Sequence, residues 1–185
     1  MNELRIDFAA LPGPDRTKLL YVHDVVRPAA SRDLAAVVYS VAEFAMGWQG
    51  GYFALFGGPR SAPRILWCPD RLNCMGFLNC LQWIDRDRYV VVNAYMYNGR
   101  SRVELPFLFV DVDAERIAFY PIKDSCNAII EVQSNGWRIH ERHHNRRFAC
   151  HDGEVIDPGT LDWRGWANLA RLKADYWKGV LGKAT

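Results

Sequence analysis

Two segments of the chain alternate apolar and polar residues on either side of an Asn-Gly dipeptide, a pattern that predicts antiparallel β-hairpins. The first runs from Tyr89 to Phe109 with its turn at Asn98-Gly99. Pairing outward from a two-residue turn gives one apolar face, made of Val90, Val92, Ala94, Met96, Val103, Leu105 and Phe107. The opposite face pairs Tyr95 with Arg102 and includes Asn93, so we expect it to meet water or a partner.

The ladder of this hairpin should be interrupted at Pro106, because proline has no amide proton to donate. After Asp113-Ala114-Glu115-Arg116 the chain is expected to turn into a third strand, from Ile117 to Ile122, which extends the hairpin into an antiparallel meander. Two shorter apolar runs, Tyr52–Phe56 and Arg64–Trp67, are bounded by glycine or proline and predict further strands.

The second hairpin joins Ala128–Ser134 to Trp137–His144 through Asn135-Gly136. A two-residue turn points Trp137 and Ile139 toward the core and pairs Glu131 with His140 on the outer face. The outward side chains of the second strand are then Arg138, His140, Arg142 and His144.

Three segments predict helices. Ser31 is a suitable N-cap for a helix to Met46 whose apolar side chains cover most of the circumference, so this N-terminal helix should be buried. Asp70 could cap a second helix, although Gly76 weakens it. The third runs from Leu161 to Val180 and carries three tryptophans, Trp163, Trp166 and Trp177, which we expect to pack it against the sheet.

These elements predict one α+β domain spanning 1–185: a mainly antiparallel sheet with two Asn-Gly hairpins, packed against an N-terminal buried helix and a C-terminal Trp-rich helix. The 185 residues, 50% of them hydrophobic, suffice for one ordinary core. The opening residues lack the pattern of a secretory signal, and no apolar run approaches the length of a membrane span. Five cysteines without a C-x-x-C pair favour free thiols, so we expect a cytoplasmic protein.

Residues 140–144 match H-E-x-x-H, the zinc-peptidase signature in which His140 and His144 bind the metal and Glu141 is the base. The signature requires a helix. On a strand, two histidines four residues apart are separated by ~13 Å, too far to share one zinc ion. The hairpin pattern favours a strand, so we expect neither a metal nor another cofactor, and a zinc-dependent hydrolase or peptidase is the alternative interpretation.

The main functional hypothesis rests on charge. Four arginines and one glutamate lie between Gly136 and Cys150, whereas the whole chain has a net charge of only +2. The outward row continues through Arg146 and Arg147, and such a stripe suits carboxylate or phosphate groups. The chain is not basic overall, so an acidic protein partner is favoured over nucleic acid. We expect a non-enzymatic inhibitor, antitoxin-like or adaptor protein that binds through this face, more strongly below neutral pH because histidine titrates there. Its oligomeric state is left open.

Overall fold

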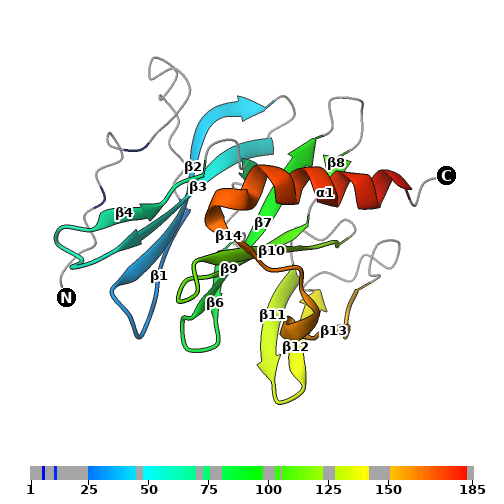
Figure 1. The fold of residues 1–185 in the computed structure, drawn as a ribbon. Helices are drawn as coiled ribbons and strands as arrows, with labels where there is room; N and C mark the ends of the chain where they lie inside the picture. Colours follow the sequence, from blue (N-terminus) through cyan, green and yellow to red (C-terminus); the bar gives the residue numbers. More distant parts are fainter. Residues whose placement is uncertain are drawn as a thin grey trace.

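The computed structural model describes Ile6, Leu11 and residues 25–44, 48–69, 73–75, 81–97, 103–104, 106–122, 128–141 and 151–182 (Figure 1). These residues form mainly antiparallel β-sheet with a single C-terminal α-helix. The strands are β1 (Val25–Pro28), β2 (Leu34–Phe44), β3 (Trp48–Gly57), β4 (Arg64–Trp67), β5 (Asn73–Met75), β6 (Leu81–Ile84), β7 (Tyr89–Tyr97), β8 (Val103–Glu104), β9 (Phe107–Asp111), β10 (Arg116–Tyr120), β11 (Ala128–Gln133), β12 (Gly136–Glu141), β13 (Val155–Ile156) and β14 (Arg164–Gly165). The helical segments are η3 (Pro158–Thr160), η4 (Trp166–Asn168) and α1 (Leu169–Gly182).

Most strands belong to one large sheet in the order β1-β2-β3-β5-β7-β9-β10-β14, with β4 paired to β3, and β6 and β8 paired to β7. Strands β11, β12 and β13 form a separate small sheet. Every strand pair is antiparallel, as the hairpin patterns predicted.

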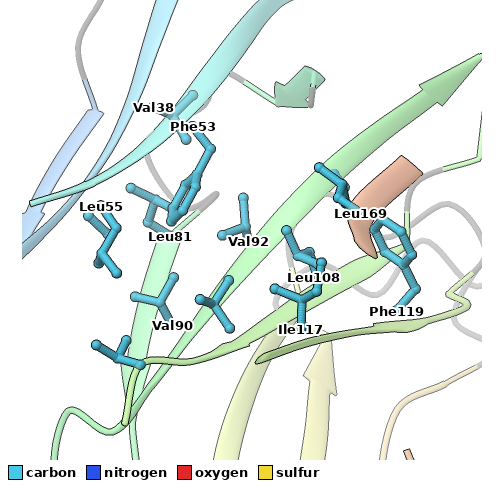
Figure 2. Close-up of a cluster of buried hydrophobic side chains, with 14 of the residues drawn as sticks. Val38, Phe53, Leu55, Leu81, Val90, Val92, Leu108, Ile117, Phe119 and Leu169 are labelled. Carbon is cyan, nitrogen blue, oxygen red and sulfur yellow. The ribbon is translucent and has the colours of Figure 1, made fainter. Parts of the chain in front are cut away.

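The central strands β7 and β9 are buried on both faces, so two hydrophobic clusters share them. On one face, Val90 and Val92 pack with Leu108 and Val110 and with residues of β2, β3 and β10 (Figure 2). Leu169 and Leu172 of α1 complete this cluster, and α1 therefore covers the large sheet on that face (Figure 1). The cluster comprises Ala36, Val38, Phe53, Leu55, Leu81, Val90, Val92, Ala94, Leu108, Val110, Val112, Ile117, Phe119, Leu169 and Leu172.

The small sheet covers the opposite face of β7 and β9. There Val91, Phe107 and Phe109 pack against Trp137 and Ile139 of β12. The ring centroids of Phe109 and Trp137 are 4.9 Å apart. The inner face of the small sheet thus packs against the large sheet, and its other face points outward.

The predicted N-terminal buried helix is wrong, because Leu34–Phe44 is strand β2, paired along its length with β3. Residues 35–39 are all buried, so both faces of the strand are apolar and the sequence shows a continuous hydrophobic run instead of alternation. Such a run fits a buried helix and a buried strand equally well. Ser31 is also not a helix cap: its amide and hydroxyl donate to the Asp87 carboxylate at 2.7 and 2.6 Å.

The second predicted helix is likewise wrong in its described part, since residues 73–75 and 81–84 are strands β5 and β6. The C-terminal helix is present but begins at Leu169 instead of Leu161. Before it, η3 ends at Leu161 in extended backbone, and Arg164–Gly165 pairs with β10 as β14.

Of the three tryptophans assigned to this helix, only Trp177 lies on it. Trp163 and Trp166 precede the helix but do pack into the two clusters, Trp166 stacking on Trp67 with centroids 5.3 Å apart. The predicted use of the tryptophans in packing is confirmed, while their placement on one helix is wrong.

The first hairpin is confirmed, but its predicted register is wrong by three residues. Tyr97 pairs with Val103 instead of Arg100, so residues 98–102 separate the paired ends where two were expected. An odd shift exchanges the faces, and Phe107 lies with Asn93 on the side that was expected to be solvent-exposed. The ladder does break at Pro106, between β8 and β9, as predicted. The third strand is present as β10. The strand predicted at Tyr52–Phe56 is part of β3, and the one predicted at Arg64–Trp67 is β4.

Candidate functional site

The outward face of β11 and β12 carries the described part of the predicted basic stripe. Residues 136–141 form a strand, as predicted, and the buried side chains of Trp137 and Ile139 anchor it to the large sheet. Because strand side chains alternate, Arg138 and His140 face outward, and both are half-buried.

The register of this hairpin differs from the prediction by two residues. Gln133 pairs with Gly136, so the turn consists of Ser134 and Asn135, and Glu131 pairs with Arg138 instead of His140. An even shift leaves every side chain on its predicted face. For residues 137–140 the assignment of inward and outward side chains is therefore confirmed, although the pairing is not.

Glu131 and His140 nevertheless make the contact that the sequence suggested. The carboxylate Oε2 of Glu131 lies 2.7 Å from Nε2 of His140 and accepts a second hydrogen bond from Nε2 of Gln133 at 3.3 Å. The hydrogen bond with His140, followed by the one from Gln133, holds the pKa of Glu131 below its usual value. The side chains of His140 and Glu131 are 40% and 56% exposed, so solvent reaches the pair.

Arg138 lies directly opposite Glu131, yet it makes no hydrogen bond or ion pair with any residue that the structure describes. Its Nε is buried without a partner, because the side chain is half-buried while the neighbouring carboxylate turns toward His140. On β13 the residue opposite Arg138 is Val155, which is 36% exposed and carries no charge. Nε of Arg138 thus occupies a buried position without an acceptor among the described residues.

The backbone at His140 and Glu141 does not have the geometry of a zinc-peptidase helix. These two residues are consecutive in strand β12, whereas the signature requires both on a helix with His144 one turn further on. Within the described residues, no group of three His, Cys, Asp or Glu side chains is placed to hold a metal ion.

The remaining predicted partner-binding residues can be placed only in part. The backbone of Tyr95 lies in β7 opposite Asn73, but its side chain is outside what the structure describes. Along the same face, Val91 and Asn93 are 4% and 3% exposed beneath the small sheet, which corrects the expectation that this face meets solvent there. Outside the described residues lie Arg102, Arg142, His144, Arg146 and Arg147.

A fully buried carboxylate, Asp111, forms the best-connected polar centre among the residues that the structure describes, and the sequence did not reveal it. Arg88 donates to both carboxylate oxygens from Nε at 3.2 Å and Nη2 at 3.0 Å, and Arg116 donates from Nε at 3.0 Å. The amide of Ala114 adds a fourth hydrogen bond at 3.2 Å. Burial raises the pKa of Asp111, but the hydrogen bonds from Arg88, Arg116 and Ala114 outweigh it, and the pKa lies below its usual value.

This centre is structural in character. The Arg116 guanidinium lies over the Trp163 ring at 4.7 Å and the Arg88 guanidinium over Tyr89 at 4.9 Å. Each arginine therefore joins the carboxylate to an aromatic ring of the second cluster, and the arrangement fixes the turn between β9 and β10.

A second group of hydrogen-bonded polar side chains, also not predicted from the sequence, connects β10 to the segment before β13. The Tyr120 hydroxyl donates to Oε1 of Glu154, and Nδ1 of His151 lies 2.6 Å from the other oxygen. Burial raises the pKa of Tyr120, and Glu154 raises it further. Burial acts to raise the pKa of Glu154 too, but the hydrogen bonds from Tyr120 and His151 leave it lowered. Glu154 thus remains ionised and joins the edges of the two sheets.

Comparison with protein-family models, curated proteins and solved structures finds no match to this chain. In the part of the chain that the structure describes, no helix is long and apolar enough to cross a membrane.

Proposed function

We propose that the protein is a non-enzymatic binding protein of the inhibitor, antitoxin-like or adaptor kind, acting in the cytoplasm, which engages an acidic protein partner through the outward face of β11 and β12. The observation that carries the proposal is Arg138, a half-buried guanidinium with no hydrogen bond or ion pair among the described residues. A buried guanidinium nitrogen without a hydrogen-bond acceptor is costly. A carboxylate from a partner can form two parallel hydrogen bonds with the terminal nitrogens of such a guanidinium.

The rigidity of the face supports the same proposal. Arg138 projects from a strand whose neighbours in sequence, Trp137 and Ile139, are 3% and 0% exposed. A side chain on a fixed strand loses less freedom on binding than one on a loop. The other residues of the predicted row, Arg142, His144, Arg146 and Arg147, lie outside the described residues.

A zinc hydrolase is not favoured by any observation. The strand at His140 and Glu141 replaces the helix that its ligands and base would need. Nucleic acid stays the other macromolecular candidate because phosphate groups also accept from arginine, but the net charge of +2 is small for such a partner.

The proposal is tested by titrating the full chain with a fluorescent oligoaspartate peptide, and separately with single-stranded DNA. We expect oligoaspartate to bind, and Arg138→Glu to weaken binding by at least about tenfold. Arg64→Glu is the matched control, since Arg64 is an exposed arginine on β4 and its reversal changes the net charge equally. An equal loss for both variants, or binding of DNA without oligoaspartate, would overturn the proposal.

A further inference from the structure

Glu131 places a carboxylate of the chain itself on the face proposed to bind carboxylates. It lies opposite Arg138 in the β11–β12 register, and its Oε2 is held by His140 at 2.7 Å and by Gln133 at 3.3 Å. Its negative charge therefore acts on Arg138 from across the ladder without forming a hydrogen bond with it.

We propose that Glu131 is a built-in competitor on this face, and that protonation of His140 cancels its charge, so that an acidic partner binds more tightly as the pH falls. This inference rests on the proposed function of the face. It adds a specific residue, Glu131, and a direction of control that the arginines alone would not provide.

The charges that face His140 decide the sign of the effect. Among the described residues they are Glu131 on β11 and Arg138 on β12 itself. On the other edge of β12, Val155 lies opposite Arg138, and the segment hydrogen-bonded beside Ile139 carries Asp152 and Glu154, whose carboxylate is bound by Tyr120 and His151. The charges of Asp152 and Glu154 are present in both states of His140, so they do not alter the sign of the change. With a neutral His140, the charges of Glu131 and Arg138 cancel. With a protonated His140, the three side chains carry a net single positive charge.

The expected change in affinity follows from the solvent exposure of His140 and Glu131. At 40% and 56% exposure, solvent screens the charges of His140 and Glu131, and one added charge on an exposed face changes affinity by about two- to fivefold. Larger changes would require charges beyond this pair.

The experiment measures oligoaspartate affinity from about pH 8 to about pH 5.5, a range in which aspartate stays ionised. We compare the unmodified protein with His140→Gln, which can still donate to Glu131 but cannot be protonated, and with Glu131→Gln, which keeps the shape and removes the charge. His140→Gln should lose about two- to fivefold of the gain seen on acidification. Glu131→Gln should bind about two- to fivefold more tightly than the unmodified protein at pH 8.

The remaining histidines contribute equally to the pH dependence of affinity in all three proteins. The effect of His140 and Glu131 is therefore the difference in affinity between the variants and the unmodified protein. If His140→Gln keeps the full pH dependence, or if Glu131→Gln binds no more tightly at pH 8, the inference is overturned. The proposed function has a separate outcome: it fails if Arg138→Glu leaves affinity unchanged at every pH. Because Glu131 is exposed, an unchanged urea midpoint for Glu131→Gln is expected and shows that any change in affinity comes from charge.

Discussion

Replacing Asp111 by asparagine tests whether the buried carboxylate holds together the turn between β9 and β10. Asparagine has nearly the same shape, but one of its two terminal groups is an amide that donates hydrogen bonds. Arg88 donates to both oxygens of Asp111 and Arg116 to one of them, so the substitution turns a donor toward a donor and removes the negative charge between two guanidinium groups.

The expected loss of stability is about 3 kcal/mol. Breaking a buried ion pair by removing one partner costs about 3–5 kcal/mol. The lower end applies because the side chains of Arg88 and Arg116 are 41% and 37% exposed and can be partly solvated when the carboxylate is lost. The amide of Ala114 can still donate to the remaining oxygen, which also limits the loss.

Urea denaturation of Asp111→Asn at neutral pH measures this loss directly. Asp113→Asn is the control in the same loop, because Asp113 is 49% exposed in its ion pair with Arg32 and should lose less than about 1 kcal/mol. A loss below about 1 kcal/mol for Asp111→Asn would show that the buried pair contributes little and would refute the argument from burial.

The pH dependence provides an independent check. The folded-state pKa of Asp111 is lowered, so its contribution to stability is complete above its unfolded-state value of about 3.9 and is lost as the pH falls through the folded-state value. The difference between the unmodified protein and Asp111→Asn should therefore narrow below about pH 4. A difference that stays constant from pH 7 to pH 3 would contradict the assigned pKa direction.

Two further substitutions probe how the small sheet is held. The Gln82 amide donates to the Ile130 carbonyl at 2.5 Å and accepts from the Ile130 amide at 2.8 Å, so Gln82→Leu should cost about 2 kcal/mol by urea denaturation, while Gln133→Leu should cost less than about 0.5 kcal/mol; equal effects would contradict this. A Cβ on Gly136, at φ +139°, would lie 2.5 Å from a backbone carbonyl of β13, so Gly136→Ala should cost at least about 3 kcal/mol. Gly153→Ala, at φ +81° with open space, should cost only about 1 kcal/mol, and a similar urea midpoint for both alanine variants would refute the steric argument.

The sequence predicted the hairpins and the direction of their side chains better than their registers. Trp137 and Ile139 point inward as expected, because alternation over several residues is a local signal. The register depends on both the length and the position of the turn, and an Asn-Gly dipeptide fixes neither. In the second hairpin Gly136 belongs to the strand and pairs with Gln133, so the turn begins one residue earlier.

The sequence could not distinguish strand β2 from a helix. Its apolar run is buried on both sides by long-range partners, β1 on one edge and β3 on the other, and no local pattern records them. The same limit applies to the candidate site. The contact between Glu131 and His140 was suggested by hairpin pairing. The arginines around Asp111, and the lack of an acceptor for Arg138 Nε among the described residues, depend on distances between separate strands.

Strand β7 has a consequence for how the molecule melts. Val90 and Val92 belong to the cluster beneath α1, while their neighbour Val91 belongs to the cluster beneath β12. Separating α1 or the small sheet from the large sheet would expose one face of β7 to solvent. It would also weaken the packing on the opposite face of the same strand. These two clusters should therefore unfold in one event, with the amide protons of β7 among the slowest to exchange with solvent.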